Sequence, residues 1–66
     1  MTLTPKQTFE IGRVADRCGP VAVRPHDSGA VLVLYATAPA RPRPDYAIAI
    51  DHDGRVVARR RLRIDP

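Results

Sequence analysis

The sequence predicts an α+β domain in which an N-terminal helix packs on a four-stranded antiparallel sheet in meander order. Three features support this prediction: a helix-start signal within the first ten residues, and two polar turns that each separate a pair of apolar runs. We expect the 66 residues to form a single domain, residues 1–66, close to the smallest size at which a chain folds alone. Hydrophobic residues make up 44% of the chain and charged residues 27%, which is typical of a folded protein and not of a disordered one.

The predicted helix covers residues 5–18. Thr4 stands at its N-cap and Gln7 three residues later, the spacing of a capping box, with Pro5 at the first helical position. Gly19 provides the stop signal. Apolar side chains recur on one face at helical spacing: Ile11, Val14, Ala15 and Cys18.

Two residues oppose the helix. Gly12 weakens a helix interior by about 1 kcal/mol relative to Ala, and Phe9 points away from the apolar face. The alternative is a strand at residues 9–14, which would give an all-β five-stranded small barrel or meander.

The first hairpin is predicted from two apolar runs, near residues 20–25 and 30–37, separated by the turn sequence PHDSG. The second strand is apolar on both faces: Val31, Val33 and Tyr35 on one, Leu32 and Leu34 on the other. A strand with this pattern is buried on both sides, but one helix covers only one face of a sheet. We therefore expect the other face to meet a curled part of the sheet or a second copy of the chain, and we expect a homodimer.

The second hairpin is predicted at residues 45–51 and 55–64, joined by the turn HDGR. A three-residue loop with Gly54 in the left-handed conformation suits this turn. An unbroken ladder from this loop predicts the pairs Asp51–Arg55, Ile50–Val56, Ile48–Ala58, Tyr46–Arg60 and Asp45–Arg61. In this register Arg60 lies on the core face, stacked beside Tyr46.

The same register sends the alternate arginines of RRRLR to the opposite face, about 6.5–7 Å apart along the strand. The proline-rich loop APARPRPD starts from the neighbouring end of the hairpin and adds two further cations. We expect the five to form a site for an acidic protein partner or for phosphate groups: Arg41, Arg43, Arg59, Arg61 and Arg63. The competing interpretation is a solvated face that protects the sheet edge from aggregation.

Catalytic and metal-binding motifs are not found in the sequence. His26, Asp27 and Ser28 are consecutive in a turn and cannot form a triad, and the DHD sequence at residues 51–53 suits turn geometry better than metal ligation. We therefore predict that the protein is not an enzyme and that it uses no cofactor, metal or small-molecule substrate.

The remaining predictions concern location and function. The N-terminal MTLTPKQTFE lacks the apolar region of a signal peptide, and no run of 18 apolar residues indicates a membrane span. The single cysteine, Cys18, is typical of a reducing compartment, so we expect a cytoplasmic protein. With a net charge of +4, we expect a small basic, non-catalytic module that docks a protein partner, with a nucleic-acid-binding regulator as the alternative.

Overall fold

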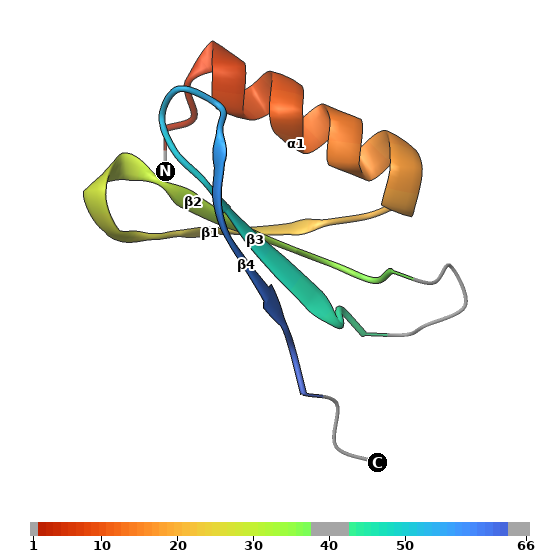
Figure 1. Cartoon of the computed structure of the whole chain (residues 1–66). Coiled ribbons are helices and arrows are strands. Elements are labelled where there is room, and N and C mark those ends of the chain that lie inside the picture. Colours follow the sequence, from red (N-terminus) through yellow and green to blue (C-terminus); the bar gives the residue numbers. More distant parts are fainter. Residues whose placement is uncertain (1, 38–42, 64–66) are drawn as a thin grey trace.

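The computed structural model describes residues 2–37 and 43–63 (Figure 1). One helix precedes four strands, which pair antiparallel in the order β1-β2-β3-β4, so the predicted helix-and-meander fold is confirmed over the all-β alternative. The elements are α1 (Pro5–Cys18), β1 (Ala22–Pro25), the short 3-10 turn η1 (Asp27–Gly29), β2 (Val31–Tyr35), β3 (Tyr46–Ile50) and β4 (Val56–Arg61).

Helix α1 begins and ends where its signals predicted. The amide of Gln7 donates to Thr4 Oγ1 at 3.1 Å, and the amide of Thr4 donates to Gln7 Oε1 at 3.0 Å, which completes the capping box. At the other end Gly19 adopts a φ of 83°, and its amide donates to the carbonyl of Ala15 at 2.8 Å. An N-cap of this kind stabilises a helix by about 1 kcal/mol.

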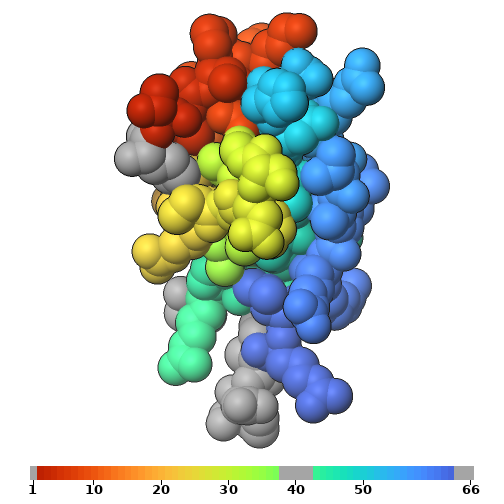
Figure 2. Space-filling model, turned by 90° about the vertical axis from the view of Figure 1, so that its left-hand side faces the viewer, coloured from red at the N-terminus to blue at the C-terminus, as the bar shows by residue number. Residues whose placement is uncertain are grey.

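Two side chains at the helix start also bind the two hairpin turns. Gln7, only 1% exposed, donates from Nε2 to the carbonyl of Gly29 at 2.9 Å and to that of Ile50 at 3.4 Å. Thr4 Oγ1 donates to the carbonyl of His52 at 2.9 Å. Figure 2 shows both turns, in yellow-green and cyan, beside the red start of the helix. The capping residues therefore also fix the position of the helix on the sheet.

The hydrophobic core lies between α1 and one face of the sheet (Figure 1). Each fully buried Val or Ile there contributes about 1.5–3 kcal/mol of hydrophobic stabilisation. Phe9 is 69% exposed, as expected for a residue outside the apolar face of the helix. The fully buried members of the core are Val14, Val31, Val33, Ile48 and Ile50, and the partly buried ones are Leu3, Ile11, Val21, Val23, Tyr35, Tyr46 and Val56.

The turn of the second hairpin forms as predicted. Gly54 has a φ of 81°, the amide of Asp51 donates to the carbonyl of Arg55 at 2.9 Å, and Ile50 pairs with Val56. Beyond this point the predicted register is wrong, because Ala49 pairs with Ala58 and leaves Val57 as an extra residue in β4.

Because of this β-bulge, the three remaining pairs of the predicted ladder are also wrong. Ile48 pairs with Arg59 instead of Ala58, and Tyr46 with Arg61 instead of Arg60. The carbonyl of Asp45 accepts from the amide of Leu62 at 2.9 Å, so Asp45 does not face Arg61 as predicted. An unbroken strand would place Val56 and Leu62 on the same face, whereas the bulge lets Val56 enter the core while Leu62 covers the other face.

Candidate functional site

Three exposed arginines alternate along β4 and the two residues after it: Arg59, Arg61 and Arg63, here called the basic stripe. The structure retains their alternation but changes their face. Arg59 lies opposite Ile48 and Arg61 opposite Tyr46, on the side of the sheet that carries the helix. The prediction that they occupy the opposite side of the sheet from these two residues is therefore wrong.

A pair of tyrosines adjoins the basic stripe. Tyr35 and Tyr46 face each other across β2 and β3, with ring centroids 5.7 Å apart and planes tilted by 57°. Burial is the main cause of a raised pKa at Tyr35, above the ordinary value of 10.0, and Cys18 and Tyr46 add to it. The positive charges of Arg17 and Arg59 lower the pKa in opposition.

Arg17 and the tyrosine pair were not part of the predicted site. Arg17 stands in the last turn of α1, and its position near Tyr35 depends on the packing of the helix against the sheet. The tyrosine pair could have been predicted from the sequence. Val33 and Ile48 are the centres of two apolar strands, and an antiparallel register that pairs them also places Tyr35 opposite Tyr46.

The loop arginines are placed only in part. Arg43 is exposed, and Arg41 lies outside the described residues, as does residue 64 of the predicted last strand. The hydrogen bond between Leu62 and Asp45 sets the segment that carries Arg43 beside the segment that carries Arg63. The carboxylate of Asp45 accepts from the amide and the hydroxyl of Thr37, each at 2.7 Å, and so closes the base of the loop.

The second candidate surface is the sheet face that α1 does not cover, here called the open face. Within residues 2–37 and 43–63, no helix or strand packs against it (Figure 1). Ala47 and Ala49 form the floor of a shallow hollow of about 310 Å³, with Leu32 and Leu34 along its β2 side. The β4 side is lined by Ala58, Arg59, Arg60 and Leu62, and His26 also lines the hollow.

Arg60 lies on the open face. It pairs with Ala47 and is exposed, so the predicted stacking of Arg60 on Tyr46 is wrong. Because Arg24 pairs with Leu32, it shares this face, and it is also exposed. On the four strands, the charged residues of the open face are therefore two arginines, one on each edge strand.

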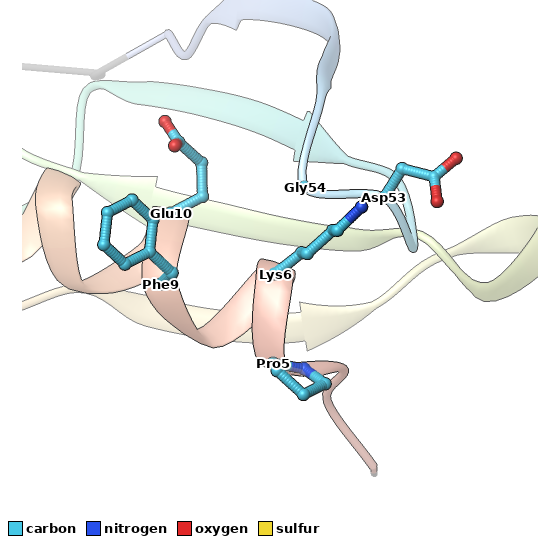
Figure 3. A pocket seen from close by; sticks show the side chains of 6 residues that line it. All are labelled: Pro5, Lys6, Phe9, Glu10, Asp53 and Gly54. Carbon is cyan, nitrogen blue, oxygen red and sulfur yellow. The ribbon is translucent and has the colours of Figure 1, made fainter.

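A further hollow, of about 300 Å³, lies where the helix start meets the β3–β4 turn (Figure 3). Phe9 and Glu10 extend from the helix, and Lys6 extends toward the turn that carries Asp53 and Gly54. The contact is close, since a Cβ added at Gly54 would lie 2.9 Å from the carbonyl oxygen of Lys6. This hollow therefore reflects a tight junction between helix and turn, with Phe9 exposed at its rim.

The acidic and histidine side chains of the second turn serve the turn itself. Asp51 Oδ1 accepts from the amides of Asp53 and Arg55 at 3.0 and 2.9 Å, and His52 Nε2 lies 3.7 Å from Asp53 Oδ2. Among the residues that the structure describes, no group of three or more His, Cys, Asp or Glu side chains is arranged to hold a metal ion.

Comparisons with protein-family models, with curated proteins and with solved structures found no match to this chain. In the described part of the chain, α1 falls short of the length and apolar character needed to cross a membrane. Function is therefore inferred from the two surfaces.

Proposed function

We propose that this chain is a small non-catalytic binding module that docks an acidic protein partner through the basic stripe. The observation that carries the proposal is the position of Arg59 and Arg61 on the same side of the sheet as the Tyr35–Tyr46 pair. Guanidinium groups offer forked donors to carboxylates, and interfaces are enriched in both arginine and tyrosine.

The arginines and tyrosines make different contributions to such an interface. The exposed guanidinium groups steer an acidic partner toward the module and raise its association rate, an effect that salt weakens. The half-buried tyrosines present apolar rings held by the sheet, which add contact area with little loss of side-chain freedom. We place the module in the cytoplasm, since its single thiol, Cys18, suits a reducing compartment.

The test replaces Arg59, Arg61 and Arg63 with Ser and compares binding with a control in which three exposed basic residues elsewhere are changed to Ser, Lys6, Arg13 and Arg55. Proteins that co-purify with the wild-type module from its source cells should be lost from the first variant and kept by the second. Titration with an acidic peptide of Glu and Tyr, followed by NMR, should shift the amides of β4 and of the two tyrosines. Partners that bind both variants equally would refute the proposal.

Nucleic acid is a second candidate partner for the same residues. Arginines at alternate strand positions lie about 6.5–7 Å apart, close to the phosphate spacing of an extended strand, and the tyrosine rings lie next to them. Three phosphate contacts on a duplex predict a log–log salt slope of about −2.7. A gel shift with single-stranded and duplex oligonucleotides tests this, and no retardation at low salt would eliminate the candidate.

A further inference from the structure

Within the four strands, the side chains of the open face form two rows across the sheet, and Leu62, which follows β4, lies beyond the first row. In order from β1 to β4, the first row is Ala22, Leu34, Ala47 and Arg60, and the second is Arg24, Leu32, Ala49 and Ala58. When either row is placed against a copy of itself in the reverse order, every Leu or Arg faces an Ala. The pattern is therefore complementary to itself after the strand order is reversed.

We propose that the open face is a homodimer interface, in which the sheets of two copies stack face to face about a two-fold axis close to parallel with the strands. This axis reverses the strand order, so β2 of each copy lies over β3 of the other. At the usual separation of about 10 Å between stacked sheets, Leu34 fills the space above Ala47 of the second copy, and Leu32 fills that above Ala49.

The leucine positions exclude the other axis that would stack the two faces. A two-fold axis perpendicular to the strands keeps the strand order and exchanges the two rows. It would set Leu34 over Leu32 of the second copy and Ala47 over Ala49, which gives overlap above β2 and a void above β3. Protein interiors tolerate neither, so the register selects the axis along the strands.

The arginines are compatible with this arrangement. The same axis sets Arg60 over Ala22 of the second copy and Arg24 over Ala58, so no arginine lies directly over another, and Arg60 is one row, about 7 Å, from Arg24 of the second copy. Both arginines lie on edge strands, where the guanidinium group can reach water while the aliphatic part of the side chain covers the rim of the interface.

The size of the face determines the expected strength of the dimer. Four strands about 4.8 Å apart and five residues of about 3.3 Å each give a footprint of roughly 320 Å² per copy before side-chain relief is added. Two copies give roughly 640 Å² before that relief is added, which is below the about 1,000 Å² expected of a stable specific interface, so we expect a weak dimer that forms at high protein concentration.

The dimer does not depend on the proposed function. Its interface centres on Leu32, Leu34, Ala47 and Ala49 of the open face, whereas Arg61 pairs with Tyr46 on the helix side and stays accessible. Arg59 pairs with Ile48 but also lines the open-face hollow. Failure of one proposal therefore leaves the other intact, because the dimer is measured by mass and the stripe by partner binding.

Sedimentation velocity over a range of concentrations tests the proposal with an exchange of large and small residues. The wild-type chain should show a monomer–dimer equilibrium, and Leu34→Ala or Ala47→Leu alone should weaken it about tenfold or more. The double variant with both changes again sets a leucine over an alanine and should recover most of the wild-type affinity. Phe9→Ala, at an exposed residue on the helix, serves as the control and should have no effect.

Three results would overturn the proposal: a wild-type chain that stays monomeric at millimolar concentration, a dimer that Leu34→Ala does not weaken, or a double variant without recovery. Circular dichroism confirms that each variant is folded. If Ala47→Leu prevents folding, the exchange at Leu32 and Ala49 tests the same geometry, and Leu34→Asp should give a monomer at every concentration.

Discussion

Ile48 lies directly opposite Arg59 in the β3–β4 ladder, one residue away from the partner that an unbroken hairpin would give it. The extra residue, Val57, causes this shift, and a shift of one residue moves every later side chain of a strand to the other face. The bulge therefore sets the basic stripe beside the tyrosine pair and leaves Arg60 on the open face.

Deletion of Val57 should preserve the pairs beyond the bulge. With Val56 joined directly to Ala58, simple alternation still places Val56 in the core and Ala58 opposite Ala49. Because Val57 is 59% exposed, little buried surface is lost, and we expect the free energy of unfolding to change by about 1 kcal/mol or less. Cross-strand NOEs should still connect Ile48 with Arg59, and NOEs from Ile48 to Arg60 instead would contradict this account.

Substitution of Gly54 by Ala should cost more stability than the same change at Gly29. Both glycines have positive φ, 81° and 78°, which costs Ala about 1–2 kcal/mol. At Gly54 the new Cβ would also lie 2.9 Å from the carbonyl oxygen of Lys6, whereas nothing lies within 4 Å at Gly29. Urea unfolding of the two variants measures the difference, and equal losses would show that the turn does not press against the helix.

Loss of the buried amide of Gln7 should destabilise the protein by about 1–3 kcal/mol, because the carbonyl of Ile50 would lose a donor inside the structure and that of Gly29 would lose a part-buried one. Gln7→Met keeps the side-chain volume while removing the hydrogen bonds, and Gln7→Ala removes both. Thr8→Ala, at an exposed position of the same helix, is the control for helix propensity. Chemical unfolding that shows Gln7→Met to be as stable as Thr8→Ala would contradict the anchoring role.

The raised pKa of Tyr35 predicts a loss of stability at alkaline pH. The folded state favours the neutral hydroxyl, so its stabilisation is complete below the unfolded value near 10 and disappears as the pH rises through the higher folded value. Thermal unfolding between neutral pH and pH values above 10 should show this decline, and Tyr35→Phe should reduce it. If the Phe variant shows the same loss of stability at alkaline pH, the loss comes from another titrating group.

Local signals in the sequence predicted the elements of this fold correctly. The capping box at Thr4 and Gln7 and the stop at Gly19 fix the helix, because each depends only on residues within one or two helical turns. The positive φ of Gly54 likewise follows from the HDGR turn. The alternation of β2 grouped Val31, Val33 and Tyr35 on one face, and the structure makes this the core face.

The structure agrees with only part of the predicted arrangement of the arginines. The alternation of Arg59 and Arg61 follows from strand geometry, but the bulge at Val57 has no local signal of the kind that marks a helix end or a glycine turn. Arg17 joins the tyrosine pair only through the packing of α1, and Arg24 and Arg60 come to share a face only after all four strands have paired.

The sequence alone indicated which segments are helix, strand and turn, with a strand at residues 9–14 as the one open alternative, since capping, alternation and turn chemistry act between neighbouring residues. The tertiary structure decided which face each arginine occupies and which sheet face stays uncovered. The physical reason is that these properties depend on the register between strands, where one extra residue in β4 lets Val56 enter the core and Leu62 cover the other side.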